Sequence, residues 1–211
     1  MRMKRLISIL ILLSFCLLQG KAQQVLFSNL KNLLEVRGDT VSTLHVERRS
    51  KKQIYLMGGA DFKIEARGNE GLSKYIKRRC YAIQVDSILY LNCRKMHYKR
   101  YRFGAWYAQA LRINGHVFYK AQPLGQVASS TMVDEEATKL GGEVGDAINA
   151  SGMVTQRVYY ELDLTTGYST FVGKERMAEL LAGHPQWIEA LQKERSEEAA
   201  VIERYLLLLK Q

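Results

Sequence analysis

Two segments in which apolar and polar residues alternate constrain the fold of this chain most strongly. Residues 107–122 alternate on both sides of Asn114-Gly115, and residues 80–93 do so on both sides of Asp86-Ser87. A two-residue hairpin turn requires positive φ, which Asn and Gly tolerate, so Asn114-Gly115 is the stronger of the two signals. Both segments predict antiparallel hairpins, and hence a sheet built from neighbours in the sequence.

The segment 80–93 begins and ends with cysteine. A turn at Asp86-Ser87 brings Cys80 opposite Cys93 on a rung without hydrogen bonds. Cα atoms on such a rung lie about 4.5 Å apart, at the short end of the range that a disulfide spans. We therefore predict a disulfide between Cys80 and Cys93. The alternative is a pair of small apolar residues that lie side by side on a buried face.

Other apolar patterns predict further strands and a helical C-terminal part. Strands are expected over 41–48, 53–57, 62–66, 157–164 and 168–172, the last two joined as a hairpin. Helices are expected over 25–36, over 71–77 and in several segments between 174 and 210.

These elements predict an α+β fold: a strongly bent antiparallel sheet or partial barrel of about eight or nine strands, with C-terminal helices on one face or end. Residues 23–211 are expected to form a single domain. Within it we expect a mainly β part (23–125), a glycine-containing helical connection (126–152), a β-hairpin (153–173) and a helical tail (174–211).

Residues 1–22 have the pattern of a signal peptide. Arg2, Lys4 and Arg5 precede an apolar run from Leu6 to Leu18, and we expect cleavage before Gln23. The mature protein is then exported, and is periplasmic or associated with the outer membrane. The alternatives are an uncleaved anchor and a lipid anchor through Cys16, although Phe15 is bulky for the residue before a lipidated cysteine.

The charge of the chain is divided between its two parts. Residues 23–130 hold 19 Lys or Arg against 7 Asp or Glu, a net charge of +12, whereas residues 131–211 hold 8 against 14, a net charge of −6. Such asymmetry indicates either an anionic partner for the basic part or attraction between the two parts within the molecule.

The residues that usually carry chemistry form no recognisable motif. His45, His97, His116 and His184 lie far apart in the sequence, so no metal site is expected. No Gly-x-Ser-x-Gly motif marks a nucleophile, and we expect neither catalytic residues nor a cofactor.

A basic, aromatic segment, residues 94–106, is the most suggestive feature for function. Its cations and rings suit anionic groups, and the hairpin that precedes it should bring it close to the basic end of residues 74–79. The predicted surface consists of Lys77, Arg78, Arg79, Arg94, Lys95, Tyr98, Lys99, Arg100, Tyr101, Arg102 and Trp106. The alternatives are a solvated basic rim and a surface that docks on the acidic tail.

Three segments, LMGGADFKI (56–64), YAIQVDSILYLNC (81–93) and YYELDLTTG (159–167), together with the helical tail, resemble a family of exported proteins of the Bacteroidota that is catalogued as a domain of unknown function, number 6563. The resemblance spans nearly all of the expected mature chain. It implies export and a shared fold, and it supplies no activity, cofactor or site.

The sequence thus favours an exported, non-enzymatic binding module of the cell envelope. Its expected partner is an anionic envelope component (a lipid head group, lipopolysaccharide or an acidic glycan) or an envelope protein, with peripheral membrane contact and no nucleic acid. The alternatives are a hydrolase that acts on envelope material and a purely structural or assembly module. A pocket in which an acid and a base converge beside the sheet would favour the hydrolase.

Overall fold

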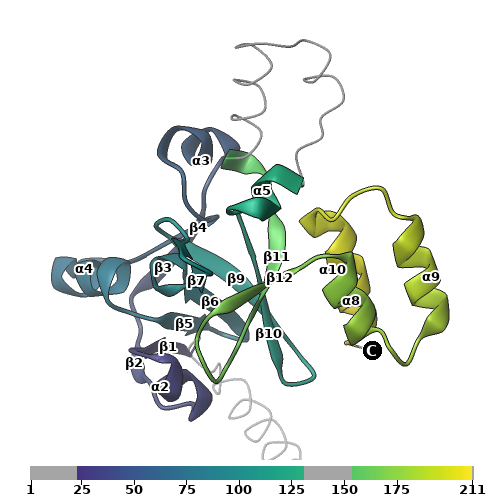
Figure 1. Cartoon of the computed structure of the whole chain (residues 1–211). Helices are drawn as coiled ribbons and strands as arrows, with labels where there is room; N and C mark the ends of the chain where they lie inside the picture. The colour runs from purple at the N-terminus through teal and green to yellow at the C-terminus, as the bar shows by residue number, and fades with distance from the viewer. Residues whose placement is uncertain (1–22, 131–153, 211) are drawn as a thin grey trace, which may run out of the picture.

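The computed structural model of the protein describes residues 23–130 and 154–210, and Figure 1 shows how their helices and strands are arranged. The predicted signal peptide lies outside these residues, as does most of the predicted connection over 126–152. Of that connection the structure describes α5 (Gln126–Ser130). The division of the chain into a signal peptide and one domain stays a prediction.

Both predicted hairpins are confirmed. β5 (Ala82–Val85) pairs with β6 (Ile88–Asn92), and β9 (Tyr107–Ile113) pairs with β10 (His116–Ala121). Positive φ occurs where the turns require it: 55° at Asp86, 49° at Asn114 and 82° at Gly115. The Asn-Gly turn therefore has the backbone conformation that its sequence predicts.

These hairpins form the centre of a ten-stranded sheet with the path β12-β11-β10-β9-β6-β5-β1-β2. β4 joins it at β9, where Phe62 lies opposite Tyr107, and β3 pairs with β4. The outer strands are β1 (Gln24–Phe27), β2 (Asp39–Val41), β3 (Leu44–Arg48), β4 (Phe62–Ala66), β11 (Val158–Leu162) and β12 (Ser169–Val172). All these pairings are antiparallel, and the described strands do not close into a barrel. The α+β class with a bent, open sheet is confirmed.

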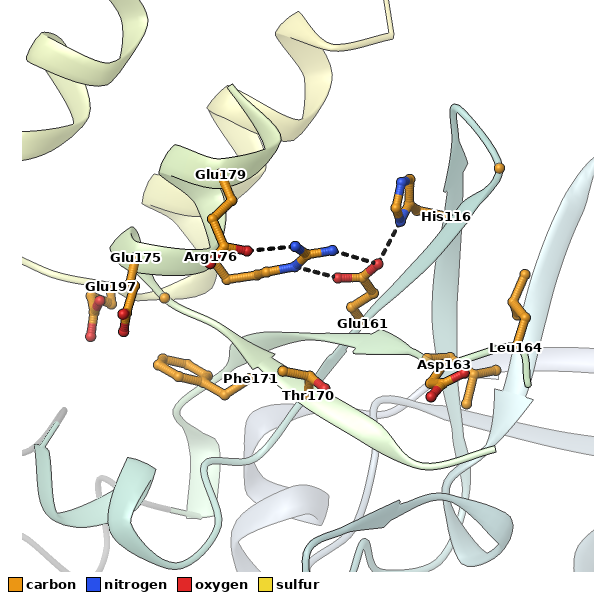
Figure 2. Close-up of a pocket in the computed structure, with 13 residues that line it drawn as sticks. His116, Glu161, Asp163, Leu164, Thr170, Phe171, Glu175, Arg176, Glu179 and Glu197 are labelled. Carbon is orange, nitrogen blue, oxygen red and sulfur yellow. Dashed lines mark hydrogen bonds and ion pairs between the residues drawn. The ribbon is translucent and has the colours of Figure 1, made fainter. Parts of the chain in front are cut away.

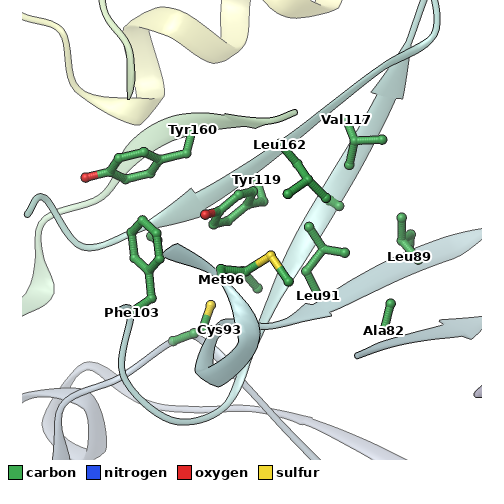
Figure 3. Packing of buried hydrophobic residues seen from close by; sticks show 14 of the residues in the cluster. Ala82, Leu89, Leu91, Cys93, Met96, Phe103, Val117, Tyr119, Tyr160 and Leu162 are labelled. Carbon is green, nitrogen blue, oxygen red and sulfur yellow. The ribbon is translucent and has the colours of Figure 1, made fainter. Parts of the chain in front are cut away.

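Alternation along the strands buries both faces of the sheet. On β10, Tyr119 belongs to one core cluster and its neighbour Phe118 to another. Figure 3 shows part of the first cluster, in which Met96 and Phe103, which precede and follow the ribbon of β7 (His97–Tyr98) and β8 (Tyr101–Arg102), pack against residues of the sheet. Phe103 meets Tyr160 edge to face there, with ring centroids 4.7 Å apart.

Helices cover the opposite face in two separate groups. α8 (Lys174–Leu180), α9 (Pro185–Lys193) and α10 (Ala199–Leu208) pack over β9 to β12, which confirms the predicted helical tail. α4 (Glu70–Arg78) packs with β4 over the other half of the sheet, and it lies far from the tail in Figure 1. The predicted helical turn over 71–77 belongs to α4 and is confirmed.

Two sequence predictions of local structure are wrong. Residues 53–57 form part of a helix, α3 (Lys51–Met57), because Ser50 and Gln53 cap its first turn reciprocally. Residues 25–36 divide into β1 and a short helix, α2 (Leu30–Leu34), because Asn29 accepts a hydrogen bond from the backbone N–H of Asn32 and starts the helix late.

The predicted disulfide is also corrected, because Cys80 and Cys93 are both free thiols. The last hydrogen bond of the hairpin runs from the Asn92 N–H to the Tyr81 carbonyl oxygen (2.9 Å). Beyond this bond the two strands of the hairpin diverge. Cys93 enters the 3-10 turn η1 (Cys93–Lys95), whereas Cys80 follows α4. The two side chains consequently lie in different core clusters.

The two thiols should react only after unfolding. Burial raises the pKa of Cys80 to about 11 and that of Cys93 to about 12, and the thiolate is the reactive form. Protein lacking residues 1–22 should react slowly with a thiol reagent at about pH 8 and should show both thiols in denaturant without reductant. Denatured, unreduced protein with no reactive thiol would contradict the structure.

Helix α10 should contribute strongly to stability through its buried face. Ile202 is fully buried, so Ile202→Ala should lower the free energy of unfolding by about 2–5 kcal/mol in chemical denaturation. Leu207 on the same helix is 45% exposed and is the matched control, for which Leu207→Ala should change stability by less than about 1 kcal/mol. Equal effects of the two substitutions would show that α10 is not packed as described.

Candidate functional site

Six of the eleven predicted basic and aromatic residues line two hollows of the surface. Lys77 and Arg78 of α4 line one of them together with Trp106. Lys99 and Arg100, in the turn between β7 and β8, line the other beside Gln126 of α5. Of the remaining predicted residues, Arg79 follows α4, Arg94 and Lys95 lie in η1, Tyr101 lines the second hollow and Arg102 is on β8.

The hollow beside α4 has a volume of about 230 Å³ and holds an excess of positive charge. Three cations line it: Lys74, Lys77 and Arg78. Its carboxylate, Glu65, already forms an ion pair with Lys63 at 2.7 Å. Within residues 23–130 and 154–210, none of the three cations has a carboxylate partner. The hollow is therefore a place where an anion would meet unpaired cations.

Trp106 forms one wall of this hollow and is held in an uncommon conformation. Its φ is 80°, which a bulky residue rarely adopts. Its carbonyl oxygen accepts a hydrogen bond from the Cys93 N–H (2.9 Å), which fixes the chain at this point. The Lys77 ammonium lies 5.4 Å from the centre of the indole ring and the Arg49 guanidinium 5.2 Å, both within cation–π range.

Arg49 is buried beneath Trp106 and holds the chain between α3 and β4. Its guanidinium donates hydrogen bonds to the carbonyl oxygens of Gln53 (3.1 Å), Gly58 (2.8 Å) and Ala60 (2.7 Å). Burial, and then the neighbouring charge of Arg157, lower the pKa of Arg49, while Asp61 acts in the opposite direction. Arg49 is thus a fixed cation against the ring of Trp106.

The same turn is held from its other side by Arg157. Its Nε donates to Asp61 Oδ1 at 2.7 Å, and its Nη2 donates to the Gly59 carbonyl oxygen at 3.2 Å. Gly59 has a φ of 84°, and a Cβ there would lie 2.5 Å from the Ala105 carbonyl oxygen. The segment LMGGADFKI therefore contains a turn that needs glycine. Two arginines hold this turn: Arg49 binds carbonyl oxygens, and Arg157 binds a carbonyl oxygen and the Asp61 carboxylate.

Asn92 joins the end of α4 to the segment that follows the hairpin. Its buried side-chain amide donates to the carbonyl oxygens of Ile76 (3.3 Å) and Cys80 (2.7 Å), and its oxygen accepts from the Arg94 N–H (3.1 Å). Asn92 therefore ties the backbone at the end of α4 to the backbone of η1, which are parts of the two basic segments that flank the hairpin.

The second hollow, at the turn between β7 and β8, uses fewer of the predicted residues. The Arg100 guanidinium lies 5.2 Å from the Tyr101 ring, and the Lys99 ammonium lies 3.3 Å from the Gln126 side-chain oxygen. Tyr98 does not belong to the surface as predicted. It is 93% buried, with 7% of its area exposed, because its ring packs in the core against Tyr160.

The acidic residues of the C-terminal helices that form ion pairs bind cations outside the predicted basic surface. Glu189 binds Lys193 (2.6 Å) and Glu194 binds Arg204 (2.9 Å), within the tail itself. Glu203 reaches Lys120 on β10 (3.2 Å). Among the described residues, the predicted basic surface is therefore not covered by the acidic tail.

A larger pocket, of about 790 Å³, lies between the end of the sheet and α8, and the sequence gives no indication of it. Figure 2 shows Glu161 at its centre, between His116 and Arg176. His116 Nδ1 lies 2.5 Å from Glu161 Oε1, and Arg176 Nε donates to Glu161 Oε2 at 2.8 Å. Only the pairing of β10 with β11 brings His116 and Glu161 to one face, and that long-range pairing is not visible in the sequence.

The surroundings keep Glu161 ionised. Burial raises its pKa, but hydrogen bonds from Arg176 and His116 and their charges outweigh burial, so its pKa lies below the usual value. Arg176 also binds the more exposed Glu179 at 2.6 Å, so it joins Glu161 of β11 to α8. The remaining acids that line the pocket are Asp163, Glu175 and Glu197.

Within residues 23–130 and 154–210, no group of three or more His, Cys, Asp or Glu residues could hold a metal ion. None of the helices in this part of the chain has the length and apolar character needed to cross a bilayer.

The fold and the site together define an α+β protein with an open antiparallel sheet, helices over one face and a basic hollow beside a tryptophan. The profile of a family of unknown function, DUF6563, matches residues 25–211, so the chain belongs to that family. This confirms the family that the sequence segments resemble. Comparison with curated proteins and with solved structures found no match.

The Glu161 network predicts a stability difference that depends on pH. Because the folded-state pKa is lowered, the carboxylate stabilises the fold above its unfolded pKa of about 4.3, and this stabilisation is lost as the pH falls through the folded-state value. At pH 7, Glu161→Gln should lower the free energy of unfolding by about 1–3 kcal/mol, and the difference from the parent should shrink below about pH 4.

The matched control for this prediction is Glu175→Gln, since Glu175 lines the same pocket but is exposed. Its effect on the unfolding free energy should be small at every pH. A Glu161→Gln effect that does not change between pH 7 and pH 3 would contradict the lowered pKa.

Proposed function

We propose that this protein is a non-enzymatic binding module that takes the phosphate or carboxylate group of an anionic component of the cell envelope into the hollow beside α4. The observation that carries the proposal is a set of cations around a half-buried tryptophan, Lys74, Lys77 and Arg78, that have no carboxylate partner among the residues that the structure describes. The location of the protein, exported and either periplasmic or bound at the outer membrane, is part of the proposal and rests on the predicted signal peptide.

The hollow suits an anion because no free carboxylate among its lining residues offsets the positive charge of its cations. Glu65 is neutralised by Lys63, and Asp61 by Arg157, so the cations around Trp106 retain their field. Arg78 offers the planar donor fork that binds phosphate or carboxylate through two hydrogen bonds, and the lysines add mobile point charges. The conformational strain at Trp106 is of the kind that concentrates at binding sites.

The volume of the hollow limits the size of the group that it takes. About 230 Å³ is below the range of roughly 300–1,000 Å³ that is typical of pockets for drug-sized ligands. One phosphorylated head group or one sugar acid would fill it. A polymer would bind by placing single units in the hollow, with the rest of the chain on the surrounding basic surface.

A hydrolase remains the second candidate, since His116 and Glu161 converge in the larger pocket beside the sheet. The geometry supports this reading less well. Arg176 binds both oxygens of Glu161, at 2.8 Å and 3.2 Å, so this carboxylate is held as the anchor of an ion network. Its inward position stabilises the junction of β11 with α8, which is a structural role.

The proposal predicts that removal of cations at the hollow weakens binding of anionic probes. Lys77→Ala with Arg78→Ala should lower the affinity for vesicles that contain phosphatidylglycerol, or for polygalacturonate, at least tenfold and flatten its dependence on salt, because charge attraction is lost. The comparison of the two probes distinguishes a lipid phosphate from a glycan carboxylate as the source of the anion.

The control is Arg195→Ala with Lys210→Ala, which removes the same charge from exposed positions of the C-terminal part. It should retain nearly the affinity of the parent protein. Unchanged binding by the Lys77 and Arg78 variant, or no binding of either probe by the parent at low salt, would refute the proposed function.

A further inference from the structure

Helix α3 exposes three consecutive large apolar side chains. Tyr55, Leu56 and Met57 are 54%, 68% and 69% exposed, whereas the preceding residue, Ile54, is only 6% exposed. Isolated apolar residues at a protein surface are common, but a contiguous group of this size marks a contact surface. This apolar group is not evident from the sequence, because residues 53–57 alternate in a way that predicts a strand.

The directions of these side chains indicate what kind of surface they meet. Successive residues of an α-helix point about 100° apart, so Tyr55, Leu56 and Met57 together cover about 200° of the helix circumference. A helix that binds in a protein groove presents residues i, i+3 and i+4 along one side. Tyr55, Leu56 and Met57 instead point to three sides of the helix. A fluid apolar medium, such as the interior of a lipid bilayer, can surround side chains that point in all three directions.

The base of α3 is rigid, so the exposed group is presented in a fixed position. The Ser50 hydroxyl accepts from the Gln53 N–H, and the Gln53 side chain accepts from the Ser50 N–H. Arg49 binds the carbonyl oxygens of Gln53 and Gly58 within and just after the helix. Figure 1 shows α3 beyond the ends of β3 and β4, to one side of the sheet.

Cations flank the apolar group on the same helix. Lys51 and Lys52 are exposed in the first turn, Arg48 precedes it, and the helix contains no carboxylate. Lysines in a first turn oppose the helix dipole, so they do not serve the stability of α3 itself. Lys52 lies about 6 Å along the axis from Leu56, a spacing at which ammonium groups reach lipid phosphates while apolar side chains enter the interface.

We infer that α3 seats the protein on the surface of a lipid bilayer that carries anionic head groups, with Tyr55, Leu56 and Met57 inserted at the boundary between head groups and acyl chains. Tyrosine is favoured at that depth, since its ring is apolar and its hydroxyl is polar. The inference rests on the proposed function for its electrostatic part, and it names the bilayer as the source of the anion. Arg49 links the two sites, because it binds α3 and lies against Trp106.

The test places a tryptophan at the inferred point of insertion. Leu56→Trp is compared with Val36→Trp, whose position is also 68% exposed but lies after α2, and with the parent protein. Each is mixed with phosphatidylglycerol vesicles whose acyl chains carry bromine, a quencher of tryptophan fluorescence. We expect additional quenching for Leu56→Trp relative to the parent and none for Val36→Trp.

A second variant separates this inference from the proposed function. The triple change Tyr55→Ser, Leu56→Ser and Met57→Ser should lower the affinity for the vesicles at least tenfold and leave binding of soluble polygalacturonate unchanged. Vesicle binding without additional quenching of Leu56→Trp would overturn the inference and leave the proposed function standing. Absence of binding to both probes by the parent would overturn both. Self-association that the triple variant abolishes would assign the apolar group to a second copy of the chain, and would also overturn the inference.

Discussion

The buried guanidinium of Arg49 is the interaction on which the arrangement of the candidate site depends. A charge removed from water must be bound by several polar groups, and the carbonyl oxygens of Gln53, Gly58 and Ala60 fulfil that need. They do so only when α3 ends and the chain turns at Gly58-Gly59 as observed. The same guanidinium lies against Trp106, so a single residue fixes the helix, the turn and one wall of the hollow.

The distribution of ion pairs explains how the uneven charge of the sequence is used. Five carboxylates of the described C-terminal part are paired: Arg176, Lys193 and Arg204 of the same part bind Glu161, Glu179, Glu189 and Glu194, and Lys120 of β10 binds Glu203. The cations of α4 and of the turn between β7 and β8 have no such partners within the described residues. Five of the unpaired cations lie at hollows with aromatic walls, an arrangement that suits the binding of an anion.

Local signals predicted the parts of the fold that depend on local chemistry. Asn114-Gly115 and Asp86-Ser87 determine hairpins through backbone conformation, and apolar spacing alone identifies the C-terminal helices. The strand prediction for residues 53–57 is wrong because alternation is a weaker determinant than the cap formed by Ser50 and Gln53. The disulfide prediction extended the register of β5 and β6 past the point where Asn92 and η1 turn the chain away.

The candidate site could be predicted only in part, because it depends on contacts between distant residues. Lys77, Arg78 and Trp106 were identified by composition, and their meeting follows from the packing of α4 beside β9. Tyr98 was assigned to the surface with its neighbours, but the ribbon turns its ring into the core. No sequence motif indicates the roles of Arg49 and Arg157 or the pocket around Glu161. Their burial and their contacts are properties of the fold: Asp61 and Arg157, for example, are 96 residues apart in the sequence.

The most direct test of this account uses the two tryptophans of the chain as reporters. In a nitrogen-15 correlation spectrum each indole N–H gives one signal, and Trp187 lies on α9, stacked against His184 and away from the basic hollow. On titration with glycerol phosphate, a soluble form of the lipid head group, the account predicts a saturable shift of the Trp106 signal and a constant Trp187 signal. An unchanged Trp106 signal, with changes confined to residues around His116 and Glu161, would contradict it.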